Sequence, residues 1–231
     1  MKPGHRTGQL VAEVCGTGAL VLAVIGSGIM AERLADGNAA LALLCNTLAT
    51  AATLLALGIA LAPVTGAHLN PVVSLALALT GRFAWRSVPR FAAAQLSGAA
   101  LGLLVAHAMF GLPLLAASRQ ARPGMALLLG EGVATCGLVL VVLRGDARRP
   151  LAVAVSVAAW IAGAYWFTSS TSFANPAVTL ARSLSDTFTG IRPADVPGFV
   201  LGQLAGAAGA VVLAKGLTAG ISEPPRGDGG Q

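Results

Sequence analysis

Two Asn-Pro pairs are the residues of this chain whose types and spacing best suggest a function. Asn70-Pro71-Val72 lies in the first half of the sequence, and Asn175-Pro176-Ala177 is its near copy in the second half. Asparagine is a strong N-cap because its side-chain oxygen accepts a free N–H of the first turn, and proline is favoured at the next position. Each pair therefore predicts a helix start, which carries partial positive charge and free N–H groups.

The helix that follows each pair is short. About ten mostly apolar residues follow each Asn-Pro, whereas a helix that spans a bilayer needs roughly 20. One such half-helix alone is also typical of an ordinary buried core helix. Two of them in corresponding places, among full-length apolar spans, indicate a permeation or binding site within a membrane.

The composition indicates an integral membrane protein. Hydrophobic residues make up 55% of the chain and charged residues 10%, against about 25% charged residues in soluble proteins. The net charge of +6 comes from arginines clustered between apolar runs, which favours a membrane surface over a nucleic-acid partner. Cys15, Cys45 and Cys136 lie inside apolar runs without metal-ligand or disulfide spacing, so we expect core residues, no metal site and no cofactor.

Six long apolar stretches predict six spans, and the two halves of the chain repeat. Glu13 of the first span matches Glu131 of the fourth, and Gln95 of the third span matches Gln203 of the sixth. Because each half has three spans, the second half must enter the membrane from the opposite side, which gives an inverted repeat. We therefore expect an all-α membrane protein with one domain over residues 1–218 and a disordered tail over 219–231. The predicted halves are 8–110 and 125–218, and the spans are 8–31, 39–61, 88–110, 125–143, 151–168 and 198–217.

The basic residues orient these helices. With the N-terminus in the cytoplasm, the inner loops are the arginine-rich segments 82–90 and 144–149. Two of the three outer segments balance their arginines with acidic residues such as Asp186 and Asp195, and the third holds Arg119 and Arg122. This arrangement follows the positive-inside rule, so we expect a multi-pass protein of the cell (inner or plasma) membrane with both termini in the cytoplasm.

A polar path is expected where the opposed half-helices meet. The backbone before each pair is not helical, and such backbone is tolerated at membrane depth only in a protein core or a water-filled cavity. Its carbonyl acceptors, with Asn70 and Asn175 as donors, suit a file of small neutral hydroxylic molecules, while the positive helix ends repel cations and protons. The expected carbonyls are those of Gly66, Ala67, His68, Leu69, Phe173 and Ala174.

Together these features resemble the aquaporin, or major intrinsic protein, family. The resemblance rests on the paired boxes, the stretch 66–74, the repeated Glu-x-x-x-Thr and the glutamines of the third and sixth spans, and it covers residues 8–218. It implies six tilted helices, two re-entrant half-helices, a pore in each protomer and a homotetramer. It also implies that Glu13 and Glu131 brace the re-entrant loops. An intramembrane carboxylate needs a partner in any case, and a proton relay is the alternative.

Two residues depart from the family pattern. Val72 replaces the usual alanine of the first box and adds bulk beside it. Val178 stands where water-selective and most glycerol-conducting relatives have an arginine that narrows the outer constriction. Counting from the boxes places the constriction at Thr50, Gly163, Ser172 and Val178, all of which are small and uncharged.

A wide, uncharged constriction discriminates weakly by size. Its resemblance to bacterial members associated with arsenic handling implies a passive channel for glycerol, urea, metalloid hydroxides such as arsenite, and water. A water-selective channel is the alternative, and an inverted-repeat secondary transporter is a further one, with Glu13 and Glu131 as its only midplane charges. The spans carry no His cluster, Ser/His/Asp set or paired catalytic carboxylates, so we do not expect an enzyme.

Three features near the expected pore each have two interpretations. Arg182 lies one helical turn beyond Val178, so it either faces solvent, which we favour, or reaches the outer vestibule. His68 contributes a backbone carbonyl or, alternatively, a pH-sensing ring. Tyr165 and the two aromatic residues after it form an interfacial anchor or a wall of the outer vestibule.

Overall fold

The computed structural model describes residues 3–219, and every regular element within this range is a helix. Six helices are long and apolar enough to cross a membrane, which confirms the predicted all-α membrane fold. Ala219 ends the last helix, and the rest of the predicted tail lies outside the described residues. The long helices are α1 (Pro3–Leu34), α2 (Ala39–Thr65), α4 (Val88–Met109), α5 (Met125–Arg144), α6 (Pro150–Phe167) and α8 (Val196–Ala219). The half-helices are α3 (Pro71–Leu79) and α7 (Pro176–Arg182), and the 3-10 turns are η1 (Trp85–Ser87) and η2 (Pro193–Asp195).

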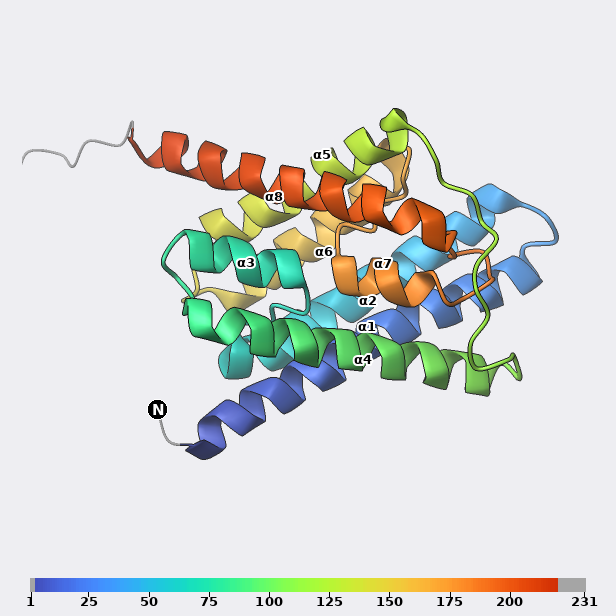
Figure 1. Cartoon of the computed structure of the whole chain (residues 1–231), viewed down its shortest axis with the longest axis horizontal. Coiled ribbons are helices and arrows are strands. Elements are labelled where there is room, and N and C mark those ends of the chain that lie inside the picture. Colours follow the sequence, from blue (N-terminus) through green and yellow to red (C-terminus); the bar gives the residue numbers. More distant parts are fainter. Residues whose placement is uncertain (1–2, 220–231) are drawn as a thin grey trace, which may run out of the picture.

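The two halves of the chain use the same packing. Helix α1 packs against α2 and α4 in the first half, and α5 packs against α6 and α8 in the second half. Contacts between α2 and α6, and between α3 and α7, join the halves. In Figure 1 the half-helices α3 and α7 lie in the middle of the molecule, between the long helices.

Glycines set the closest helix contacts. A Cβ atom on Gly102 of α4 would overlap the backbone carbonyl of Gly18 in α1, and one on Gly206 of α8 would overlap that of Gly132 in α5. Small residues let helix backbones approach in lipid, where no hydrophobic force holds helices together. The α1–α4 and α5–α8 pairs therefore depend on the absence of a side chain at equivalent places.

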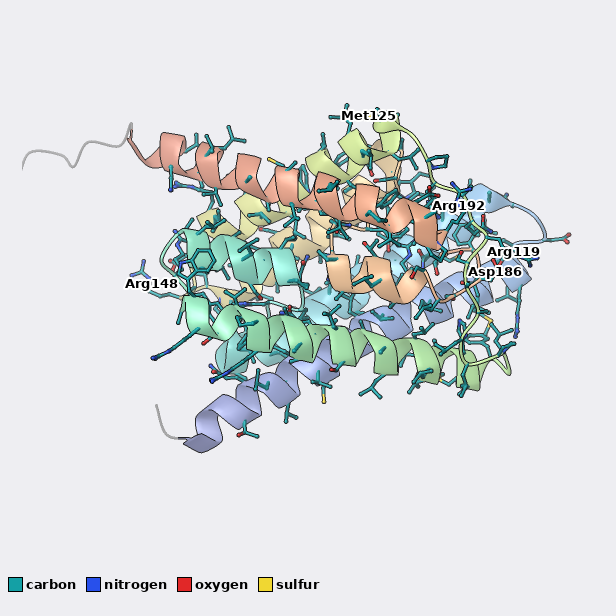
Figure 2. All side chains as sticks on the ribbon, viewed as in Figure 1. Arg119, Met125, Arg148, Asp186 and Arg192 are labelled. Carbon is teal, nitrogen blue, oxygen red and sulfur yellow. The ribbon has the colours of Figure 1, made fainter. Side chains whose placement is uncertain are left out.

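The molecule has two distinct polar ends, which we name after residues labelled in Figure 2. Arg148 lies at one end, the Arg148 end, whereas Arg119, Asp186 and Arg192 lie at the other, the Asp186 end. The start of α1 and the end of α8 both lie toward the Arg148 end (Figure 1). An even number of spans requires this.

Replacing Gly206 by alanine tests the close packing of α8 on α5. The added methyl group must push the two backbones apart, which costs about 1–3 kcal/mol or a fall of roughly 2–10 °C in melting temperature. A Cβ atom added to Gly216 of the same helix would meet no other atom within 4 Å, so Gly216→Ala is the matched control and should cause no fall. Equal melting temperatures for the two variants in detergent would contradict the packing described above.

Candidate functional site

The two Asn-Pro pairs begin α3 and α7 as N-caps. The side-chain Oδ1 of Asn70 accepts the backbone N–H of Val72 at 3.0 Å. The Oδ1 of Asn175 accepts the N–H of Ala177 at 3.0 Å and that of Val178 at 3.4 Å. The caps also fix the orientation of both amide groups, because only the Nδ2 atoms remain to bind elsewhere.

These amide groups join the two halves reciprocally. The Nδ2 of Asn70 donates to the carbonyl oxygen of Ala174, and the Nδ2 of Asn175 donates to that of Leu69, both at 2.8 Å. Each half-helix start is thus bonded to the loop that precedes the other. An asparagine Nδ2 carries two hydrogens, so each amide keeps a second donor beyond this bond.

The loops before α3 and α7 adopt the same unusual backbone. Ala67 and Leu69 have φ of 50° and 49°, and their counterparts Ser172 and Ala174 have φ of 50° and 49°. Positive φ is uncommon for residues other than glycine and costs on the order of 1–3 kcal/mol each. Other interactions must therefore hold both loops in this shape.

Two buried carboxylates supply those interactions. Glu13 accepts the N–H groups of His68 at 3.1 Å and Leu69 at 2.8 Å, and Glu131 accepts those of Phe173 at 2.8 Å and Ala174 at 2.9 Å. Successive N–H groups in alternating left-handed backbone form a concavity that binds anions. The geometry is what bracing of the loops requires, and both side chains have no exposed surface.

A glutamine completes each carboxylate. Gln95 of α4 donates from Nε2 to Oε2 of Glu13 at 2.7 Å, and Gln203 of α8 donates to Oε2 of Glu131 at 2.6 Å. The paired Glu and Gln positions that repeat in the sequence are therefore hydrogen-bonded partners in space.

A cavity of about 650 Å³ runs along these loops. It extends from residues near the Arg148 end, such as Arg82 and Pro150, past both asparagines to Ser172 and Arg182. Among its lining residues are the loop residues expected from the sequence: Gly66, Ala67, His68, Leu69, Phe173 and Ala174. No group of three or more His, Cys, Asp or Glu side chains within residues 3–219 could hold a metal ion.

Three of the four expected constriction residues line the cavity. Thr50, Ser172 and Val178 do so and are buried, but Gly163 does not. The prediction for Gly163 is wrong because it lies on another face of α6, exposed and beside Phe167. The α6 stripe that lines the cavity has a four-residue spacing that ends at Tyr165, whose hydroxyl donates to Oγ1 of Thr50 at 3.3 Å.

The aromatic run at the end of α6 divides between two environments. Tyr165 is 4% exposed and lines the cavity, whereas Trp166 and Phe167 are 49% and 56% exposed. The alternative of a vestibule wall therefore fits Tyr165, and the exposed pair retains the interpretation of an interfacial anchor.

Val72 does not line the cavity. It is buried in the apolar core with Ala134 and Leu138, whereas the next residue, Val73, faces the cavity. The extra bulk of the first box is thus accommodated in the core between α3 and α5.

Arg182 contradicts the favoured interpretation of a solvated side chain. It is 2% exposed and lines the same cavity as Val178. The spacing argument missed it because α7 ends at this residue and the following loop folds back over it, a feature that no local pattern predicts. The Asp186 end of the cavity therefore carries a charge that the four predicted positions lack.

His68 contributes its ring as well as its backbone. Nδ1 lies 2.9 Å from Oγ of Ser74, and the ring packs against Phe83 and Phe91 with centroids 4.7 and 5.1 Å apart. The ring is therefore fixed in an aromatic cluster at the side of the cavity toward the Arg148 end.

Replacing Glu131 by glutamine tests the carboxylate brace. The amide accepts one N–H of the loop and turns its NH₂ group toward the other, leaving a buried donor unpaired at a cost of about 1–3 kcal/mol. The melting temperature of the purified protein should fall accordingly. Glu32→Gln is the control, because exposed Glu32 accepts the single N–H of Phe188 at 3.3 Å. A fall no larger than that of the control would contradict the brace.

Comparison with known proteins agrees with this architecture. The family model of the major intrinsic protein matches residues 2–149. Aquaglyceroporin AqpS of Rhizobium meliloti (strain 1021) is 52% identical over 91% of this chain and 90% of that protein, and aquaporin NIP2-2 of Zea mays is 29% identical over 89% and 71%. The X-ray structure of the aquaglyceroporin from Plasmodium falciparum has the same fold, with a TM-score of 0.67 at 21% identity over 90% of this chain and 94% of that one. The chain belongs to the major intrinsic protein family.

Proposed function

We propose that this protein is a passive membrane channel for glycerol, other small neutral solutes and water. The observation that carries the proposal is the cavity lined by both re-entrant loops and both box asparagines. Its carbonyl acceptors and amide donors replace the hydrogen bonds that a hydroxylic solute makes in water. Family membership and the 52% identity to an aquaglyceroporin support the same conclusion.

The choice of solute follows from the side chains at the Asp186 end. Thr50, Ser172 and Val178 are small, and Val178 leaves the position after the second box uncharged. We infer that these three small side chains leave room for a solute wider than water, with Tyr165 in place of the predicted Gly163 at this level. Urea and metalloid hydroxides such as arsenous acid share the size and hydroxylic or amide character of glycerol, so we include them among the substrates.

The proposal also covers the membrane, the assembly and the orientation. We place the protein in the cell membrane with the Arg148 end in the cytoplasm, because the arginine-rich loops lie on that side. Both termini are then cytoplasmic. A homotetramer with one pore per protomer is the assembly that the family resemblance implies, and exposed apolar side chains such as Leu129, Leu201 and Val212 give the surface that lipid or neighbouring protomers cover.

Two other functions fit the site less well. A secondary transporter needs free ion-coordinating groups at the midplane, but the carboxylates of Glu13 and Glu131 each already accept two loop N–H groups and one glutamine donor. An enzyme would alter the permeant, and chemical analysis of the transported solute distinguishes that case. A water-selective channel remains the main alternative.

Stopped-flow light scattering on proteoliposomes tests the proposed substrate class. We expect wild type to pass glycerol and water, and Val178→Arg to lose about tenfold of its glycerol flux while keeping water flux, because the new side chain narrows the path. Val178→Ala is the control and should keep both fluxes.

The water-selective alternative would be supported if wild-type vesicles pass water faster than protein-free vesicles but pass glycerol no faster than they do. Loss of both fluxes in Val178→Arg would show a blocked pore, and the assignment of this position to solute selection would then be wrong.

A further inference from the structure

The buried guanidinium of Arg182 lies where the pore has lost a charge. Arg182 and Val178 are one turn apart in α7, and both line the cavity. Tyr165 of α6 lines the same cavity. The charge missing directly after the second box is therefore present one turn nearer the Asp186 end.

No carboxylate within residues 3–219 forms an ion pair with Arg182. The ion pairs within the described range are Arg119–Asp186, Arg148–Asp146 and Arg192–Asp195. Glu131 interacts electrostatically with Arg182, but its carboxylate oxygens accept hydrogen bonds from the loop N–H groups and from Gln203. A buried charge without an ion pair is costly, so its retention at the edge of a pore points to a functional role.

The guanidinium of Arg182, which lines the cavity, keeps hydrogen-bond donors that are not used within the described part of the chain. Only Nε of Arg182 is bonded, to the carbonyl of Thr189, and Nη1 and Nη2 make no hydrogen bond to any residue in 3–219. Ser172 lines the same cavity, and its buried hydroxyl also has no hydrogen-bond partner in that range. The free Nη groups of Arg182 can bind an oxygen of a passing solute.

The side chain is held rigidly in this place. Its guanidinium lies over the ring of Phe173, with Cζ 3.2 Å from the centroid. Phe173 packs in turn against Phe199, at 5.0 Å between centroids. On the same ring, Arg122 has its Cζ at 5.1 Å and donates from Nε to the carbonyl of Gly190 at 2.8 Å.

The loop that binds Arg182 is itself clamped. In Figure 1 the segment 111–124 crosses the Asp186 end between α4 and α5. Two backbone hydrogen bonds join this segment to the loop after α7. The N–H of Ser118 donates to the carbonyl of Ser183 at 2.9 Å, and the N–H of Arg192 donates to the carbonyl of Gln120 at 2.7 Å. Arg119 donates two hydrogen bonds to the carboxylate of Asp186, from its backbone N–H at 2.9 Å and from Nε of its guanidinium at 2.7 Å. Together they hold the pKa of Asp186 below its ordinary value.

We propose that Arg182, with Ser172 and Tyr165, forms the specificity-determining constriction at the Asp186 end of the pore. The guanidinium repels cations, and its free N–H groups bind an oxygen of a neutral solute. Because Arg182 lies one helical turn beyond Val178, it provides a barrier to cations while the path beside Val178 stays wide. This inference rests on the proposed channel function and assigns the residue that sets its charge selection.

Replacing Arg182 by methionine tests the proposal in proteoliposomes, with methylammonium entry measured beside glycerol and water fluxes. We expect the ratio of methylammonium entry to water flux to rise about tenfold, because removing a nearby unit charge lowers the barrier for a cation. Arg182→Lys should keep the cation out. Arg33→Met is the matched control, because Arg33 also stacks on an aromatic ring and bonds a carbonyl but is exposed and does not line the cavity.

A second variant guards against a folding defect. The double variant Val178→Arg with Arg182→Met returns one arginine to the pore and should again exclude methylammonium. A ratio of methylammonium entry to water flux in Arg182→Met equal to that of wild type would overturn the proposal. So would a double variant that leaks as much as the single one.

The two proposals fail separately. If wild type passes water but not glycerol, the proposed solute class is wrong, yet methylammonium entry still reports on Arg182. If wild type passes glycerol and Arg182→Met changes neither methylammonium nor glycerol flux, the channel function stands and the role of Arg182 falls.

Discussion

The structure depends on one interaction made twice, a buried carboxylate that binds two successive backbone N–H groups. Glu13 and Glu131 hold the loops before α3 and α7 in left-handed backbone that these residues do not favour alone. Residues of the same loops also line the cavity. The same loop residues are therefore both held by the carboxylates and part of the cavity wall.

The inverted repeat places the same set of polar side chains in each half of the molecule. Each half supplies one carboxylate, one glutamine partner and one asparagine, and each asparagine bonds the loop of the other half at 2.8 Å. Hydrogen bonds thus join the two halves where the half-helices begin, while glycine contacts set the helix pairs around them. Polar groups near the centre of a bilayer are costly unless they are paired, and here pairing and the polar path use the same residues.

Repetition and capping chemistry made much of this predictable from the sequence. The helix starts, the six spans and the matched Glu and Gln positions are local or periodic patterns, and the structure contains each of them. The face of α6 that lines the cavity was not predictable, because counting residues back from the second box assumes a conformation for the loop between them. That count points to Gly163, whereas the residue that lines the cavity is Tyr165. Arg182 was misjudged for a related reason, since its burial depends on two loops that are far apart in the chain and meet over α7.

The central claim is that solute passes between the half-helices, and cysteine substitution at adjacent positions of α3 tests it most directly. Val73 lines the cavity, whereas Val72 is buried in the core. With Cys15, Cys45 and Cys136 replaced by alanine, glycerol flux is measured before and after a small water-soluble methanethiosulfonate. We predict that reagent blocks the flux of Val73→Cys and leaves that of Val72→Cys unchanged. Flux through Val73→Cys that persists after complete labelling, or equal block of both variants, would contradict this path.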